Sequence, residues 1–65
     1  MEVTFKAARV NAGMTQQHVA KILGVNKNTI SNYERYITSP DIDTARKLAE
    51  IYGCTVNDLK YRKDA

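Results

Sequence analysis

Apolar residues recur at spacings of three and four along most of this 65-residue chain, and single glycines or a proline interrupt the pattern. That spacing is typical of short helices with one buried face. The interruptions fall at Gly13, Gly24, Pro40 and Gly53. No segment shows the strict alternation of apolar and polar residues that indicates a strand. The pattern therefore predicts an all-α fold of five short helices: before residue 13, at 16–23, at 27–36, at 42–52 and after 55.

Residues able to cap a helix precede the last four of these segments. Thr15, Asn26 and Asp41 each carry a side-chain oxygen that can accept from a free amide in the first helical turn. Thr55 and Asp58 form a variant of the capping box, with aspartate in place of the usual glutamate or glutamine. The starts of these helices are therefore encoded locally.

Residues 15–36 meet the requirements of two helices that cross steeply around a tight turn. Close crossing needs a small residue on the first helix, which Ala20 provides, and the turn needs a residue that tolerates positive φ, which Gly24 provides. Ile30 is spaced to pack back onto Ala20. Other apolar residues are expected to fill the space between the two helices and the core: Val19, Leu23, Val25 and Tyr33. Ile37 is expected to face the core. We predict a helix-turn-helix motif within residues 15–36.

The chain from residue 5 to residue 59 resembles the phage-repressor-like helix-turn-helix family, also called the xenobiotic-response-element type. The run TQQHVAKILGVNKNTISNYERYITSPDIDTARKLAEIYGCTVNDL carries the resemblance. It implies a compact five-helix domain, with the motif formed by the second and third helices. The length of the chain predicts that residues 1–65 form one such domain. The resemblance also implies sequence-specific binding of double-stranded DNA as a transcriptional regulator, most commonly a repressor, with the third helix in the major groove.

The outward side of the predicted third helix is polar and holds no carboxylate. Asparagine can bond adenine through two atoms at once, and lysine can donate to guanine. By position, the resemblance implies that bases are read by Lys27, Asn28 and Asn32, flanked by Asn26 and Thr29. Two alternatives are a face that meets only water and a Thr29 that only satisfies the start of the helix.

Contacts to the DNA backbone are expected at both ends of the motif. The resemblance places a phosphate-contacting glutamine at Gln16, where free amides and the helix dipole favour an anion. The other backbone candidates are Gln17, Ser31, Arg35 and Thr38. For Arg9 and Glu34 the resemblance implies a structural ion pair that braces the first helix against the third. The alternative for Arg9 is a direct contact with phosphate.

Two positions depart from the family's pattern. His18 stands where a glutamate is common, so the capping box at Thr15 loses its return bond. Arg35 and Tyr36 replace the Asn-Gly that often ends the third helix. Because tyrosine is poorly suited to a left-handed cap, the pattern leaves the conformation of this loop open.

Composition narrows the class of protein. The formal net charge is +3, and residues 1–38 carry all of the excess, with five bases against two acids. This favours a polyanionic partner, and the alternative is an ordinary solvated basic face. The single cysteine, Cys54, excludes an internal disulfide, and no segment reads as a signal peptide or a membrane span. We expect a cytoplasmic protein, prokaryotic or phage-encoded and nucleoid-associated when bound to DNA.

The sequence argues against an enzyme, because it has no phosphate-binding glycine loop, no paired-carboxylate cleft and no metal-ligand spacing. We expect no cofactor and no metal. The alternative to a regulator alone is an antitoxin, or another interaction module, that binds a protein partner and represses its own operon. A homodimer is expected to bind half-sites about 34 Å apart. Its predicted contact region includes Val56, Leu59 and Tyr61.

Overall fold

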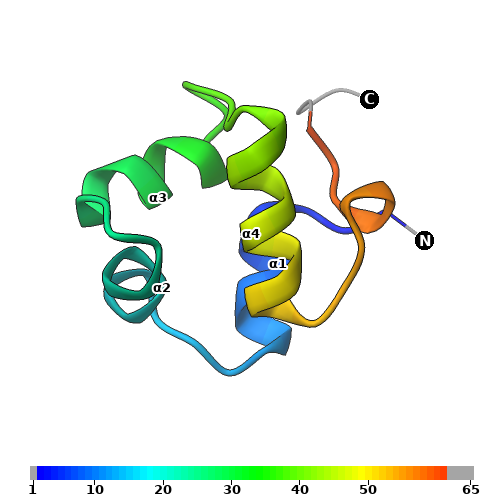
Figure 1. The fold of residues 1–65 in the computed structure, drawn as a ribbon, viewed down its shortest axis with the longest axis horizontal. Helices are drawn as coiled ribbons and strands as arrows, with labels where there is room; N and C mark the ends of the chain where they lie inside the picture. The colour runs from blue at the N-terminus through cyan, green and yellow to red at the C-terminus, as the bar shows by residue number, and fades with distance from the viewer. Residues whose placement is uncertain (1, 62–65) are drawn as a thin grey trace.

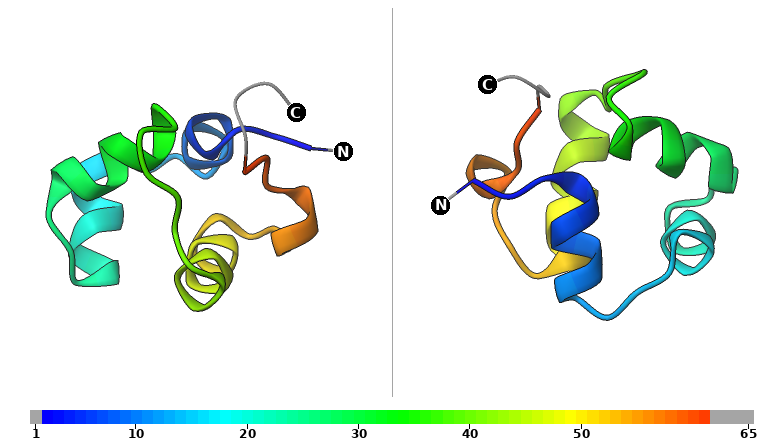
Figure 2. Two further views of the ribbon diagram at one scale, coloured as in Figure 1. Left: turned by 90° about the horizontal axis from the view of Figure 1, so that it is seen from above. Right: turned by 180° about the vertical axis from the view of Figure 1, so that it is seen from behind.

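A computed structural model describes residues 2–61. The helices follow one another as α1 (Phe5–Asn11), α2 (Gln16–Leu23), α3 (Lys27–Glu34) and α4 (Ile42–Tyr52), and a single 3-10 turn, η1, covers Val56–Asp58 (Figure 1). Viewed from the front and from above, α1 and α4 lie between the α2–α3 pair on one side and η1 on the other (Figures 1 and 2). The α2–α3 pair therefore forms one end of the molecule.

The prediction of an all-α fold is confirmed, but the prediction of five helices is wrong, since residues 2–61 hold four α-helices. The fifth segment is only the turn Val56–Asp58, because the backbone becomes extended at Leu59. There it forms a parallel bridge with Val3. Val3 N donates to Asp58 O at 2.7 Å, and Lys60 N donates to Val3 O at 2.8 Å. Pairing with the N-terminal segment thus replaces a further helical turn.

Each α-helix begins at a residue whose side chain accepts from the backbone of the first turn. Thr15 Oγ1 accepts from His18 N, Asn26 Oδ1 from Asn28 N, and Asp41 Oδ1 from Thr44 N. The predicted caps are therefore confirmed, and Thr4 adds an unpredicted one at the start of α1. Gly24 and Gly53 end α2 and α4 in the left-handed conformation, with φ of 78° and 74°.

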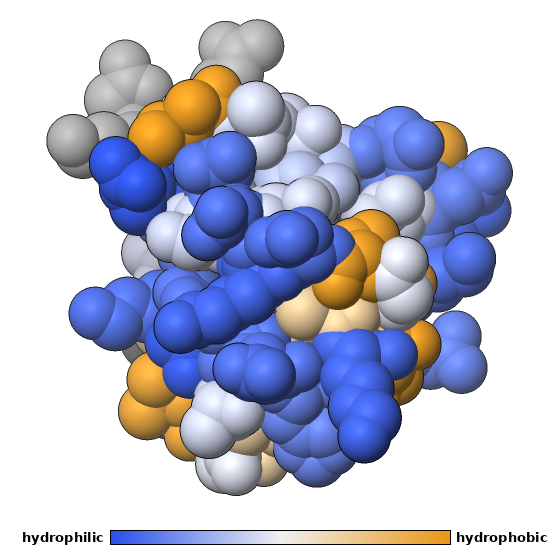
Figure 3. Space-filling view, turned by 90° about the vertical axis from the view of Figure 1, so that its left-hand side faces the viewer, coloured by the Kyte–Doolittle hydropathy of each residue, from blue (hydrophilic) through white to orange (hydrophobic). Residues whose placement is uncertain are grey.

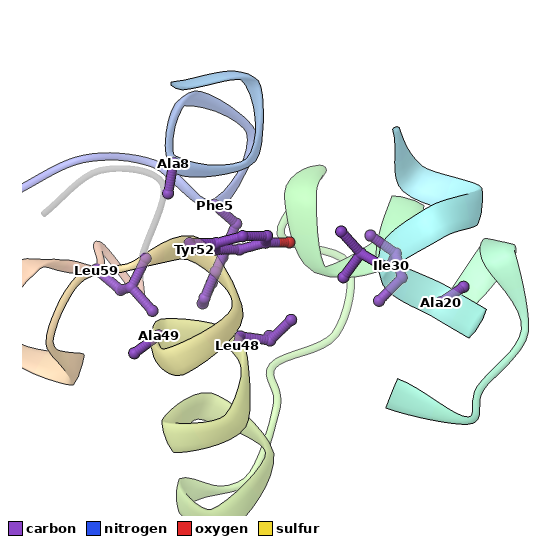
Figure 4. Close-up of a cluster of buried hydrophobic side chains, with 9 residues drawn as sticks. Phe5, Ala8, Ala20, Ile30, Leu48, Ala49, Tyr52 and Leu59 are labelled. Carbon is purple, nitrogen blue, oxygen red and sulfur yellow. The ribbon is translucent and has the colours of Figure 1, made fainter. Parts of the chain in front are cut away.

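The core lies where all four helices meet. Its largest fully buried side chains come from distant parts of the chain and are Phe5, Val19, Ile30, Leu48 and Leu59. Figure 4 shows this cluster, with Leu48 and Tyr52 of α4 between Phe5 and Ala8 of α1 on one side and Ile30 and Ala20 of the motif on the other. The motif is thus attached to the rest of the domain through a continuous apolar cluster.

Three apolar residues were assigned to the wrong environment. Leu59, predicted to contact a second copy, is 1% exposed and packs within the core of its own chain. Ile37, predicted to face the core, is 58% exposed because α3 ends at Glu34 and the helical spacing no longer applies. Val25, predicted to fill the same space, lies at the surface of the turn between α2 and α3.

None of the helices in residues 2–61 has the length and apolarity needed to cross a membrane.

Candidate nucleic-acid interface

The crossing of α2 and α3 sets the direction of α3. Ala20 and Ile30 are both buried at the crossing, so the two backbones approach closely. The Ala20 carbonyl accepts from Gly24 N at 2.8 Å and from Val25 N at 3.0 Å, which closes the end of α2. Asn26 then caps α3, so only residues 24–26 connect the two helices. A turn this short fixes the direction of α3 relative to α2.

The outer side of α3 presents amide, hydroxyl and cationic groups. Lys27, Asn28 and Arg35 are exposed, whereas Thr29, Ser31 and Asn32 are partly buried. Figure 3 shows the end of the molecule formed by α2 and α3, where mostly hydrophilic side chains surround a smaller apolar area. The one acidic residue within α3 is Glu34, and its side chain is only 4% exposed. The exposed part of this helix therefore holds no negative group.

Asn26 already has a structural task. Its Oδ1 accepts from Asn28 N at 2.8 Å and caps α3. The side-chain NH₂ group is not part of that bond, so the residue keeps two donors for another partner. Thr29 is not the residue that caps this helix, since Asn26 does so.

Arg9, Glu34 and Gln16 form one hydrogen-bonded group between α1, α2 and α3. Arg9 Nε donates to Glu34 Oε2 at 2.6 Å, and Arg9 Nη2 donates to Glu34 Oε1 at 3.2 Å. A third bond from Arg9 Nη1 reaches Met14 O at 2.8 Å. The pair is present as the family resemblance implied, with side chains that are 12% and 4% exposed.

The electrostatic consequence is that the charge of Glu34 is matched inside the protein. The hydrogen bond to Glu34 raises the pKa of the Arg9 guanidinium, and burial opposes this shift only in part. A bidentate guanidinium–carboxylate pair is among the stronger charge-assisted contacts in proteins. Glu34 thus presents little negative charge to a polyanion.

The third member, Gln16, was predicted only as a phosphate contact. Its Nε2 donates to Glu34 Oε1 at 3.0 Å. The sequence pattern did not indicate this bond, because the two residues are separated by 18 positions. The only sequence signal was that both positions carry long polar side chains near a predicted helix crossing.

A shallow depression lies beside the start of α2. It is lined by Arg9, Thr15, Gln16, Gln17 and Lys27. Thr15 Oγ1 accepts from His18 N, and the first amide that donates to a backbone carbonyl within the helix is Val19 N, which donates to Thr15 O. The amides of Gln16 and Gln17 come before these donors and have no acceptor within the helix. Lysine, carboxamide side chains and the free amides of a helix start are all groups that can bind phosphate, whereas the charge of Arg9 is already paired with Glu34.

Tyr36 adopts the left-handed conformation that its sequence made doubtful, with φ of 60°. Ile37 N donates to Asn32 O at 3.0 Å, the bond that defines a Schellman ending for α3. Tyr36 Oη donates to Lys60 O at 2.9 Å, and its ring lies 5.9 Å from that of Phe5. These contacts hold a conformation that is normally left to glycine. They leave Arg35 and Thr38 exposed on either side.

Comparison with known proteins agrees with this geometry. The profile of the family described as "Helix-turn-helix" matches residues 5–59. The HTH-type transcriptional regulator ImmR of Bacillus subtilis is 43% identical over 54 residues, covering 83% of this chain and 42% of that protein. The cryptic phage CTXphi transcriptional repressor RstR of Vibrio cholerae is 41% identical over 51 residues, covering 78% and 46%.

A shorter relative matches along most of its length. An uncharacterized HTH-type transcriptional regulator of Archaeoglobus fulgidus is 32% identical over 59 residues, covering 91% of this chain and 84% of that protein. The chain spans less than half the length of ImmR and RstR. No solved structure gives a significant match. The chain belongs to the phage-repressor-like helix-turn-helix family of transcriptional regulators.

Proposed function

We propose that this chain binds double-stranded DNA sequence-specifically as a transcriptional regulator, with repression as the expected outcome and α3 in the major groove. One observation carries the proposal: the exposed side of α3 holds amides, hydroxyls and cations, while its one carboxylate is paired with Arg9. In the major groove of DNA, the edges of the bases carry hydrogen-bond donors and acceptors that amides and hydroxyls can match. The phosphates on either side of the groove attract cations. Two relatives are named as a transcriptional regulator and a transcriptional repressor, which supports the same role.

In this proposal the base contacts come from the first two turns of α3. Lys27 and Asn28 are exposed at its start, and Asn32 follows one turn later. Asn26 contributes through the NH₂ group that capping leaves over, and Thr29 flanks the contact. Each well-formed contact to a base should contribute about 1–3 kcal/mol of discrimination.

The DNA backbone would be held on both sides of that groove. Gln16 and Gln17 meet a phosphate at the start of α2, next to the depression that Arg9 and Lys27 also line. The flanking backbone beyond the proposed base contacts would be contacted by Ser31, Arg35 and Thr38. Such contacts set the register of the protein without reading sequence.

We further propose that residues 1–65 act as a single DNA-binding unit in the cytoplasm and bind DNA as a homodimer. Residue 1 and residues 62–65 lie outside the described part of the chain. A dimer contact cannot use Leu59, which is buried in its own chain. Val56 and Tyr61 are partly buried against the same core, so exposed apolar side chains such as Ile37 and Ile42 are better candidates for the contact.

A second candidate function is that of an antitoxin or similar module that binds a protein partner and represses its own operon. One observation favours it. A depression lined by Ile22, Leu23, Lys47, Glu50 and Ile51 opens on the surface, and Ile22 is largely exposed there. This surface uses none of the residues proposed to contact DNA.

The deciding experiment is selection of bound duplexes from a random DNA pool, with the mass of the complex measured by light scattering. We expect one enriched, two-fold symmetric sequence bound by two chains. The affinity for that sequence should fall steeply with salt, because bound lysines and arginines displace counterions from phosphates. Failure to enrich any sequence, or a flat response to salt, would contradict the proposal.

A further inference from the structure

We propose that Glu34 is a positioning residue for DNA binding: it turns the Gln16 amide so that an N–H of that side chain points to a phosphate. This inference rests on the proposed function. Bracing of the fold alone would explain why Arg9 and Glu34 are paired. The inference gives this pair a second role, in the contact with the DNA backbone.

The geometry begins with Glu34 Oε1, which accepts two bonds. One comes from Gln16 Nε2 at 3.0 Å and the other from Arg9 Nη2 at 3.2 Å. A carboxylate can only accept, so the carboxamide of Gln16 must present its nitrogen, not its oxygen, to Glu34. The carboxylate thereby decides which end of the amide lies on the inside.

The Gln16 amide then has one donor in use and one available. Its nitrogen carries two N–H bonds, and the second diverges from the one directed at Glu34. Gln16 lines the depression at the start of α2 together with Arg9 and Lys27. A side chain that is already ordered loses little rotamer freedom when it binds, so the bond to Glu34 should strengthen the contact with phosphate.

Arg9 makes this arrangement compatible with a polyanion. An unpaired carboxylate next to a phosphate would repel it. Arg9 binds both oxygens of Glu34, so the acceptor that orients Gln16 adds little negative charge. Glu34 thus orients the N–H donor of Gln16, and Arg9 removes the repulsion that an unpaired carboxylate would exert on a phosphate.

The test is a double-mutant cycle on affinity for the selected duplex. The background is Arg9→Met with Glu34→Leu, which replaces both charged partners by apolar groups of similar length and is expected to keep the fold. Gln16→Ala should weaken binding roughly tenfold in the wild-type chain, the effect of losing a bond to a charged group. In the apolar background the same substitution should weaken binding by about twofold or less.

Gln17→Ala is the matched control, because Gln17 is exposed, lies in the same depression and has no bond to Glu34. Its effect should be equal in the two backgrounds. If Gln16→Ala weakens DNA binding by the same factor in both backgrounds, Glu34 only braces the fold and the inference is overturned. If Gln16→Ala has no effect in the wild-type chain, the inference is likewise overturned. Absence of selective binding by the wild-type chain would instead reject the proposed function.

A second measurement does not depend on the variants. In the DNA-free wild-type protein, the side-chain NH₂ group of Gln16 should show nuclear relaxation typical of an ordered group, whereas that of Gln17 should be mobile. Equal mobility of the two groups would overturn the inference.

Discussion

At its N-terminal end α3 presents Lys27 and Asn28 to solvent, whereas at its C-terminal end Glu34 is buried against Arg9 and Tyr36 is bonded to Lys60. The whole helix is eight residues long. The difference shows how a short helix can be anchored at one end and still expose its first turn to a partner. The ion pair of Glu34 and the hydrogen bond of Tyr36 both lie at the end away from the proposed base contacts.

The largest expected effect is on the anchored end. Glu34→Ala should lower the free energy of unfolding by about 3–5 kcal/mol, because it leaves the charge of Arg9 buried without its partner. Urea denaturation followed by circular dichroism measures the change. Glu50→Ala removes an exposed carboxylate and is the control, with an expected change within about 0.5 kcal/mol. An equal loss in both variants would show that the pair does not anchor α3.

The next effect is on the reading end and leaves stability nearly unchanged. Asn28→Ala and Asn32→Ala should each reduce discrimination between the selected duplex and its single-base variants by about 1–3 kcal/mol. Gln16→Ala, by contrast, should weaken all duplexes alike. Competition binding with a set of duplexes measures both. If all three substitutions weakened selected and random DNA equally, the division of tasks along α3 would be wrong.

A smaller effect is expected at the loop that follows α3. Tyr36→Phe removes the bond to Lys60 O and should lower the free energy of unfolding by about 0.5–1.5 kcal/mol. Burial raises the pKa of the Tyr36 phenol above its ordinary value of 10. This contribution to stability is therefore complete below pH 10 and is lost as the pH rises through the folded-state pKa.

Denaturation curves at neutral and alkaline pH measure both consequences. Tyr36→Phe should lose less stability than the wild-type chain at high pH. Tyr33→Phe is the control, since no hydrogen bond is formed by the Tyr33 hydroxyl within residues 2–61. An identical alkaline loss in the wild-type chain and Tyr36→Phe would contradict this account.

The smallest effect on stability is expected at the start of α3. Asn26→Asp keeps an oxygen that can accept from Asn28 N, so the free energy of unfolding should change by only a few tenths of a kcal/mol. The same substitution adds a carboxylate at the reading end and should weaken DNA binding. Thermal melts and binding to the selected duplex separate the two results. Unchanged DNA affinity would mean that this end does not approach the phosphates.

Local features of the fold could be predicted from the sequence, and features that depend on distant residues could not. Thr15, Asn26 and Asp41 were recognised as caps because a cap and its partner lie within three positions. Ala20 and Ile30 were recognised because a helix crossing restricts side-chain size. Leu59 was misassigned because periodicity marks an apolar residue without showing whether it packs in its own chain.

The same difference between local features and features that depend on distant residues applies to the candidate interface. The polar outward side of α3 could be predicted from helical spacing, whereas its contacts with bases stay a prediction. The pairing of Arg9 with Glu34 came from family resemblance, since the two residues lie 25 positions apart. The bond from Gln16 to Glu34 came from the structure alone, because nothing in either residue's neighbours specifies it.

The bridge between Val3 and Leu59 brings the two ends of the described chain together, on the far side of the molecule from α2 and α3 (Figure 1). A short linker could join these ends, and new ends could be opened in the exposed loop at residues 37–39. Exposed loops are where circular permutation usually succeeds. In such a permutant α4 would precede α1 in the chain, and α3 would become the last helix to be synthesised.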